Sequence, residues 1–421
     1  MVYTITTHTY QDLKNYYDEN LNKDDSLVKT SNDVPTPIDC VEEMIYTIPE
    51  EFWMNSSIKI LDPCCGCGNF FLAIYFKLLK YHSAEHIISN MLFFNDLNTD
   101  RLNVVKLIFG IRSNVTEKDF LVFDEDIKYD LIVANPPYAK LLPNGKRASK
   151  NHNMIGSFIN KSLKILKEKG YLLYITPDNW MSFADRNTLI KTLTSLQIIH
   201  INIHSAKKKY FKKVGSSFTW YLIENTPSYK DIVVEGIWKN KEYKSIVKSE
   251  ERRFIPLFYN KLIQSIINKT IDKANDKFEV LTSSDLHKYT KKKLISKDKD
   301  EEHPYKLIHT PSQTVYASRP HKFQDGYKVF ISTTTYYSTF VDNCGMTQSI
   351  AFVRCKNKKQ AEKIQKILMH PMYRFINNIC RYGNFNNIRI LQNFPKCMNY
   401  KKVYETFGIT KEEQEFIEKN L

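Results

Sequence analysis

The stretch that decides the fold is ILDPCCGCGNF, residues 60–70. Its apolar start predicts a short buried strand that ends at Pro63, and the apolar run after it predicts a helix. Gly66 and Gly68 lie in the turn between them, where glycine allows the backbone to approach a ligand closely. The turn lacks both the GxGxxG spacing and the Lys-Ser/Thr of a phosphate loop, which disfavours dinucleotides and nucleoside triphosphates. An ordinary strand-to-helix turn also remains open at this point.

Strand and helix patterns alternate on both sides of this turn. Apolar segments at 90–98, 129–137 and 171–178 predict strands, and the segments at 69–82, 99–110 and 155–170 predict helices, the last of them ending at Gly170. The segments 198–204 and 216–224 are expected to close the sheet as a hairpin. The alternation predicts an α/β fold: a mainly parallel sheet with helices on both faces.

The second half of the chain differs from the first in its sequence pattern and its charge. Residues 328–355 are rich in β-branched and aromatic side chains and predict strands, while 356–380 predicts a helix interrupted near Pro371. Residues 291–304 are predicted to form a charged loop. Residues 1–225 carry 26 Lys+Arg against 25 Asp+Glu (net +1), and 226–421 carry 35 against 21 (net +14). Such an asymmetry favours contact with a polyanion, nucleic acid first, although a solvated lysine-rich surface would look the same.

The totals exclude several classes of protein. A chain of 421 residues with 42% hydrophobic composition favours two or three domains. Its eight cysteines are too sparse for a disulfide framework, and no second Cys/His pair completes a zinc site beside the CCGC run, so we expect no metal. No apolar run approaches the roughly 20 residues of a membrane helix, which predicts an intracellular protein that does not bind membranes.

Two further strand ends carry candidate ligand-binding residues. Asp96 ends the second predicted strand, about 30 residues after the first, where a carboxylate can accept both hydroxyls of a ribose. Asp119 and Phe120 follow, as an acceptor for an exocyclic amine and a ring that can cover a purine. Each could also be a routine surface acid or core phenylalanine.

The segment LIVANPPYAK, residues 131–140, ends a buried strand with the tetrapeptide Asn135 to Tyr138. An exocyclic amine is a weak nucleophile, because its lone pair is delocalised into the adjoining ring. The side-chain oxygen of Asn135 and the carbonyl of Pro136 can both accept from it and favour the pyramidal nitrogen of the transition state. Pro136 and Pro137 fix the backbone, and Tyr138 can stack on an extruded base. The alternative is a strand terminator with an incidental asparagine.

Together these residues resemble the amino-group methyltransferases that use S-adenosylmethionine, specifically DNA N6-adenine methyltransferases of the gamma arrangement, as in type II restriction-modification systems. The resemblance implies a Rossmann-like class I methyltransferase sheet and a C-terminal α+β target-recognition domain. It also implies a cofactor site and a catalytic tetrapeptide. The cofactor residues would be Thr36, Pro37, Asp62, Pro63, Gly66, Gly68, Asp96, Asp119 and Phe120, and the catalytic residues Asn135, Pro136, Pro137 and Tyr138.

The resemblance extends more thinly toward the C-terminus. Phe211 matches the aromatic residue that packs against the flipped base, although it could simply begin a hairpin. The loop after Tyr138 holds Lys146 and Arg147, which could touch phosphates beside the site. Arg319, Lys322 and Arg381 are candidates for DNA contacts in the second half, as is Asn384.

We therefore expect a short lead-in (1–30), a catalytic domain (31–225) and a basic recognition domain (226–421). The expected reaction is site-specific transfer of the sulfonium methyl to a flipped adenine in double-stranded DNA, without a covalent enzyme intermediate. We expect a monomer, in the cytoplasm of a prokaryote or the DNA-containing compartment of a virus-infected cell. RNA amino-methylation and protein glutamine N5-methylation remain open, since related enzymes share the tetrapeptide. Neither the net charge of +14 on residues 226–421 nor the order of the motifs favours protein glutamine methylation.

Overall fold

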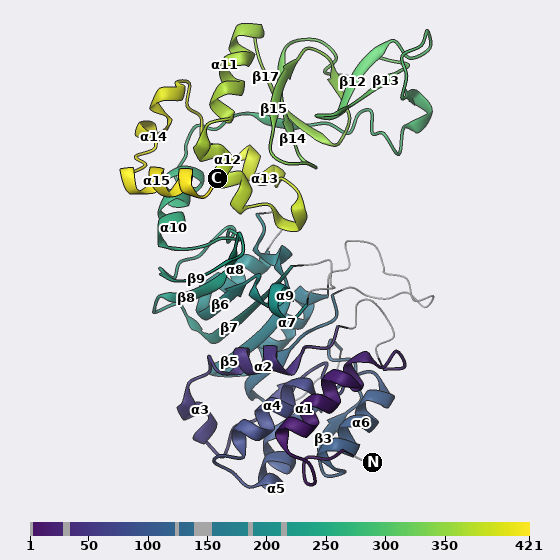
Figure 1. The fold of residues 1–421 in the computed structure, drawn as a ribbon, viewed down its shortest axis with the longest axis vertical. Helices are drawn as coiled ribbons and strands as arrows, with labels where there is room; N and C mark the ends of the chain where they lie inside the picture. The colour runs from purple at the N-terminus through teal and green to yellow at the C-terminus, as the bar shows by residue number, and fades with distance from the viewer. Residues whose placement is uncertain (1–2, 28–33, 123–125, 139–153, 184–187, 212–216) are drawn as a thin grey trace. The chain divides into compact units, whose positions relative to one another are not determined.

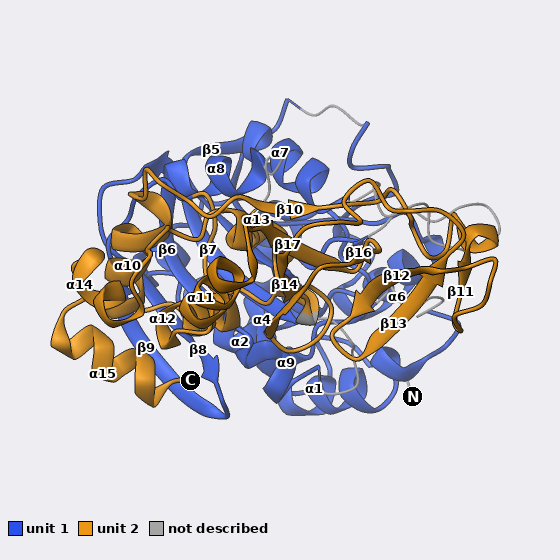
Figure 2. Ribbon diagram, turned by 90° about the horizontal axis from the view of Figure 1, so that it is seen from above, with its two compact units in different colours: residues 1–178, 188–252 blue, residues 179–187, 253–421 orange. Residues whose placement is uncertain are grey.

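The computed structural model describes residues 3–27, 34–122, 126–138, 154–183, 188–211 and 217–421, except for the side chain of Asn384. The chain forms two compact units (Figure 2), Met1–Asp178 with Thr188–Arg252 (unit 1) and Asn179–Asn187 with Arg253–Leu421 (unit 2). None of the described helices is both long and apolar enough to cross a lipid bilayer.

Unit 1 is built on a nine-stranded sheet with the order β3-β2-β1-β4-β5-β7-β6-β8-β9. Its strands are β1 Ile60–Asp62, β2 Leu92–Asn95, β3 Asn114–Thr116, β4 Tyr129–Ala134, β5 Leu166–Pro177, β6 Leu196–Ile203, β7 Phe218–Pro227, β8 Ile232–Trp238 and β9 Lys241–Val247. The first five are parallel neighbours, β6 is parallel to β8, and β7 is antiparallel to both β5 and β6. The carboxyl ends of β1, β2, β4, β5 and β6 therefore meet at one edge, where ligands bind in open α/β sheets.

Helices cover both faces of this sheet, as predicted (Figures 1 and 2). Figure 2 shows α7 and α8 on one side of the strands and α1, α2 and α4 on the other. The helices of the unit are α1 Tyr10–Glu19, α2 Ile38–Ile45, α3 Glu50–Met54, α4 Asn69–Leu78, α5 Ala84–His86, α6 Thr99–Phe109, α7 Ile155–Ile165, α8 Thr188–Ser195 and α9 Ser205–Lys209. The main hydrophobic core lies between α1, α2, α4, α6 and the sheet.

Two sequence predictions for unit 1 have clear outcomes. The pairing of 198–204 with 216–224 is confirmed, because β6 and β7 are antiparallel neighbours. The helix predicted over 155–170 is wrong in its last five residues, because α7 ends at Ile165 and β5 begins at Leu166. There Lys169 takes a left-handed φ of 60°. Lys167 forms an ion pair of 2.8 Å with Asp130, so this segment is held by the sheet and not by helical packing.

Unit 2 is α+β and contains two four-stranded sheets, with the orders β10-β17-β14-β15 and β11-β13-β12-β16. Its strands are β10 Val280–Thr282, β11 Ile295–Ser296, β12 Tyr305–Thr310, β13 Gln313–Ala317, β14 Lys328–Ser332, β15 Thr339–Asp342, β16 Gly345–Met346 and β17 Ile350–Arg354. Its helices are α10 Lys261–Ile267, α11 Lys358–Leu368, α12 Pro371–Ile379, α13 Ile388–Gln392, α14 Val403–Thr406 and α15 Lys411–Lys419. The predicted charged loop at 291–304 thus also supplies the short strand β11.

The units divide the chain at different positions from the predicted functional domains. Strands β8 and β9 lie beyond residue 225 and extend the sheet of unit 1. In the N-terminal segment, the Tyr17 hydroxyl of α1 donates to the Cys67 carbonyl at 2.7 Å, so this segment supports the glycine turn. The assignment of 226–421 to target recognition stays a prediction.

Candidate functional site

The glycine turn after β1 lies at the carboxyl edge of the sheet. Gly66 and Gly68 have φ of 55° and 91°, which favours glycine at both positions. Gly68 is the N-cap of α4, and a Cβ there would lie 2.9 Å from Cε2 of Phe109. A Cβ on Gly66 would meet nothing within 4 Å. Gly68 is therefore needed for packing beneath the turn, whereas Gly66 leaves open space beside the backbone.

Asp96 holds this turn from the end of β2. Its carboxylate accepts from the backbone N–H of Gly66 at 2.8 Å and of Asn98 at 2.9 Å. The side chain is buried. A carboxylate has about four acceptor positions, so two remain for ligand hydroxyls. This geometry fits the ribose-binding role predicted for Asp96, which no contact here tests directly.

In the turn, Asp62, Cys65 and Cys67 are buried, and Cys64 is half-buried. Burial raises the pKa of Cys64 and Cys65 well above the usual range, with Asp62 and Asp96 adding to the effect. Burial also raises the pKa of Asp62, against a hydrogen bond from the Cys64 N–H. Pro63 is buried, and its carbonyl accepts from Asn95 Nδ2 at 3.0 Å. Neutral thiols are poor nucleophiles, so this geometry supplies no thiolate for covalent catalysis.

The segment before α2 reaches both the glycine helix and the tetrapeptide. The Thr36 carbonyl accepts from Asn69 Nδ2 at 2.9 Å, and Thr36 Oγ1 is 3.1 Å from Asn135 Nδ2. Pro37 is the N-cap of α2. Thr36 was predicted to contact the cofactor; the structure shows in addition that it fixes the asparagine, a role the sequence did not reveal.

The tetrapeptide follows β4 at the same edge of the sheet. Asn135 Nδ2 donates to the Val34 carbonyl at 2.9 Å. A carbonyl can only accept, so this bond fixes the orientation of the amide and directs Oδ1 away from Val34. The Tyr138 hydroxyl donates to that Oδ1 at 2.6 Å. Pro136 is buried and Pro137 half-buried. The acceptor predicted for an amine is therefore oriented, and the protein's own tyrosine occupies it.

Two aromatic rings in sequence lie beside Tyr138. Its ring lies 5.8 Å from that of Phe218 at the start of β7, and Phe218 stacks on Phe211 at 4.7 Å. Burial raises the pKa of Tyr138, so its hydroxyl stays protonated. The structure thus brings Phe211 and Tyr138 together through Phe218, a residue that sequence reasoning placed only within a strand.

Asp119 and Phe120 lie beyond β3. Asp119 is exposed, and its Oδ1 accepts from the Leu121 N–H at 3.0 Å. Phe120 is buried, with its ring 5.3 Å from that of Phe158 in α7. This position fits a core phenylalanine as well as a purine-covering ring, so its cofactor role stays a prediction.

Sequence reasoning missed a buried acid–base pair at this edge. Asp178 follows β5, and its Oδ2 lies 3.8 Å from Nε2 of His204, which follows β6 with a φ of 66°. Asp178 N–H donates to the Ser217 carbonyl and His204 N–H to the Phe218 carbonyl. The pair therefore brackets the start of β7. Only a long-range contact reveals it, since 25 residues separate the two in the sequence.

The candidate DNA-contacting residues differ in exposure and in the groups that they contact. Arg319 is exposed but held by Asp285, with its Nη2 2.8 Å from Oδ1. Lys322 is exposed, with Nζ 5.0 Å from the centre of the Phe323 ring. Arg381 packs 5.1 Å over Tyr336. Lys146 and Arg147 lie outside the described residues, as does the side chain of Asn384.

The sheet order, the glycine turn after β1 and Asn-Pro-Pro-Tyr after β4 match the arrangement expected of a class I methyltransferase fold. The solved structure of DrdV bound to DNA matches with a TM-score of 0.59 and 12% identity, over 98% of this chain and 60% of that one. The type IIL restriction-modification enzyme MmeI matches with a TM-score of 0.53 and 10% identity, over 92% and 76%. These likenesses concern the fold, whose predicted class they confirm.

Residues 66–211 match the profile of the Eco57I restriction-modification methylase family. The type II methyltransferase M.VspI of Vibrio sp. (strain 343) is 26% identical over 200 residues, 44% of this chain and 46% of its own length. M.TthHB8I of Thermus thermophilus is 30% identical over 149 residues, 31% and 32% of the two chains. An uncharacterized adenine-specific methylase of Mycoplasma pneumoniae is 23% identical over 322 residues, 55% and 76%. The resemblance drawn from the sequence is confirmed, although the chain covers less than half the length of the first two relatives.

Proposed function

We propose that this protein is a site-specific DNA adenine-N6 methyltransferase of the restriction-modification type, with S-adenosylmethionine as methyl donor. The observation that carries the proposal is the orientation of Asn135, whose Nδ2 is bound by the Val34 carbonyl and whose Oδ1 is presented beside Tyr138. Such an oxygen can accept from an exocyclic amine as its nitrogen becomes pyramidal.

The residues of the glycine turn fit this cofactor. The open space beside Gly66 and the oriented carboxylate of Asp96 suit an adenosyl group with a free ribose. The turn has no lysine to bind a triphosphate. When bound, the cofactor supplies a methyl group on a positively charged sulfur. We infer that Thr36, Pro37, Asp62, Asp96, Asp119 and Phe120 hold it.

The chain's own residues would then position the base and its amine. Asn135 Oδ1 and the Pro136 carbonyl would accept the two amine hydrogens, while the Tyr138 and Phe211 rings would hold the flipped base. Double-stranded DNA is the proposed partner, because the charge excess lies in residues 226–421. We expect the protein to act as a monomer inside the cell.

The test compares acceptors and variants with radiolabelled cofactor. The full chain is offered unmethylated plasmid DNA, RNA of the same sequences and a glutamine-containing protein extract. We expect transfer to DNA, recovered as N6-methyladenine. Asn135→Ala should lower the transfer rate by about 10²–10³-fold or more, with cofactor binding retained.

Asn225→Ala serves as the matched control. Asn225 Nδ2 also donates to a backbone carbonyl, that of Lys167 at 3.1 Å, but far from the tetrapeptide in the sequence. Its transfer rate should match that of the native protein. Undiminished transfer by Asn135→Ala would refute the assignment of the site, and transfer to RNA or protein alone would refute the proposed substrate.

A further inference from the structure

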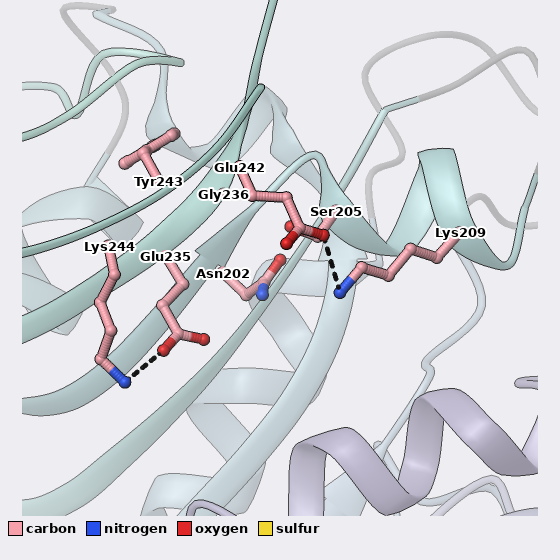
Figure 3. A pocket seen from close by; sticks show the side chains of 8 residues that line it. All are labelled: Asn202, Ser205, Lys209, Glu235, Gly236, Glu242, Tyr243 and Lys244. Atoms are coloured by element: carbon pink, nitrogen blue, oxygen red, sulfur yellow. Dashed lines mark ion pairs between the residues drawn. The ribbon is translucent and has the colours of Figure 1, made fainter. Parts of the chain in front are cut away.

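A polar pocket of about 300 Å³ opens in unit 1 (Figure 3), at the low end of the roughly 300–1,000 Å³ typical of small-molecule sites. It is formed by β6, β8, β9 and α9. Its lining residues are Asn202, Ser205, Lys209, Glu235, Gly236, Glu242, Tyr243 and Lys244. None of them belongs to the proposed methyl-transfer site.

Asn202 is a buried polar residue of the pocket, with 2% of its surface exposed. Its Nδ2 lies 3.3 Å from Glu43 Oε1. A carboxylate only accepts, so this contact fixes the amide orientation. The Oδ1 of Asn202 has no hydrogen-bond partner among the described residues. A buried acceptor without a donor is unfavourable. A ligand that placed an N–H or O–H group against Asn202 Oδ1 would therefore be stabilised.

The charged groups around Asn202 have an excess of acid. Lys244 pairs with Glu235 at 2.6 Å, and Lys209 pairs with both Glu43 at 3.4 Å and Glu242 at 3.5 Å. This cluster therefore holds three carboxylates and two ammonium groups, one negative charge in excess. His200, which lies 3.3 Å from Glu235, does not offset it, because burial lowers its pKa.

The composition of the pocket decides the class of ligand. Among the residues that the structure describes, no group of three or more His, Cys, Asp or Glu side chains is arranged to hold a metal ion. An anion would meet the excess negative charge, and a neutral alcohol would leave that charge in place. A ligand with one positive charge and several N–H donors satisfies both demands.

We propose that this pocket binds a small organic ammonium ion, a primary amine whose N–H groups donate to Asn202 Oδ1. Glu242, which shares Lys209 with Glu43, then supplies the countercharge. The amine would be a free metabolite-sized molecule, since the volume fits a short alkylamine. The inference does not depend on the proposed methyl transfer.

The test uses two probes that differ in N–H groups but not in charge. Butylammonium and butyltrimethylammonium are titrated into the DNA-free full chain at low salt, and binding is followed by saturation-transfer NMR. We expect saturable binding of butylammonium, at least about tenfold tighter than that of the quaternary ion. Equal affinities, or no saturable binding of butylammonium, would overturn the proposal; water alone would then occupy the pocket.

Variants place the binding within the pocket. Asn202→Leu removes the acceptor at similar volume, and Glu242→Gln removes a charge from a side chain that is 72% exposed and so leaves folding intact. Each should weaken butylammonium binding at least fivefold. Glu405→Gln in unit 2, a 73% exposed acid, is the control and should bind as the native chain does. Unchanged affinity in Glu242→Gln would place the ligand elsewhere.

Discussion

The Tyr138 hydroxyl lies on the acceptor that the proposed reaction needs. It donates to Asn135 Oδ1 at 2.6 Å, so an incoming amine must displace it. The hydroxyl and the ring therefore have opposite expected effects: the hydroxyl competes with the amine, while the ring holds the base.

Replacing Tyr138 separates these effects. Tyr138→Phe keeps the ring and frees the acceptor, so we expect kcat/KM for DNA to be retained or raised up to a few-fold. Tyr138→Ala removes base stacking, which is worth about 1–3 kcal/mol per base, and should lower kcat/KM by at least about tenfold. Steady-state methylation assays measure both. An equal loss in the two variants would show that the hydroxyl itself is required.

The Asp178–His204 pair has opposing effects on stability. Burial raises the pKa of Asp178 from 3.8 to about 7 and lowers that of His204 from 6.5 to about 4. The folded acid keeps a proton that the unfolded acid releases, so its contribution falls as pH rises from about 4 to 7. The folded histidine lacks a proton that the unfolded one binds, so its contribution rises from about pH 4 to 6.5. The two nearly cancel over that window.

Asp178→Asn should reveal the histidine's contribution alone. Relative to the native chain, its free energy of unfolding should rise by on the order of 3 kcal/mol from pH 4 to 6.5. Urea denaturation across that range measures the change. The complementary variant His204→Asn should show the opposite slope. Profiles parallel to that of the native chain would mean that neither group is shifted.

At this scale the sequence predicted residue types better than their contacts. The tetrapeptide, the glycines and Asp96 follow from spacing along consecutive strand ends. Two other features could not be predicted from spacing: the hydrogen bonds that hold Asn135 against Val34 and Thr36, and the Asp178–His204 pair. Each joins segments that only tertiary folding brings together.

At the scale of elements, the start of α4 depends on Gly68. Gly68 and Gly383 both lie in the left-handed region, with φ and ψ of 91° and 27° for Gly68 and of 62° and 25° for Gly383. A Cβ on Gly383 would lie 3.9 Å from Cδ2 of Phe385, an ordinary contact, whereas one on Gly68 lies 2.9 Å from the buried ring of Phe109. The two glycines thus share the backbone strain of substitution and differ in steric overlap.

Gly68→Ala should therefore destabilise the protein more than Gly383→Ala. Overpacking of this kind typically costs about 1–3 kcal/mol, and we expect that difference between the two free energies of unfolding in urea. Cofactor affinity should fall only in Gly68→Ala, since only its turn borders the proposed site. Equal destabilisation would mean that Phe109 moves aside freely.

Element types were predictable where periodicity was strong, but their partners and ends were not. The β6–β7 pair was predicted, yet nothing local places β7 also beside β5. Residues 166–170 continue the polar and apolar spacing of a helix in the sequence. They form a strand because β4 supplies backbone partners, an effect that no local pattern contains.

At the scale of the whole molecule, the charge asymmetry predicts how binding responds to salt. Phosphate contacts by Lys and Arg release counterions, so affinity for DNA should fall steeply with salt. If Lys322 contacts a phosphate, Lys322→Ala should reduce the slope of log Kd against log salt by about 1 for any sequence. Fluorescence anisotropy with a labelled duplex measures this slope. Lys80, an exposed lysine of unit 1, provides the control Lys80→Ala, which should keep the native slope; equal slopes in all three would exclude Lys322.

The composition of unit 2 has a consequence for any exchange of specificity between relatives. Residues 179–183 follow β5 and pack with residues 253–421. Ile255 N–H donates to the Met181 carbonyl, Asn387 Nδ2 donates to the Phe183 carbonyl, and the Arg253 guanidinium lies 4.4 Å over the Phe183 ring. A chimera joined at one point would therefore leave Met181 and Phe183 without their native neighbours. A functional transplant of this unit needs two grafts, a nine-residue insert and the long C-terminal segment, taken from the same donor.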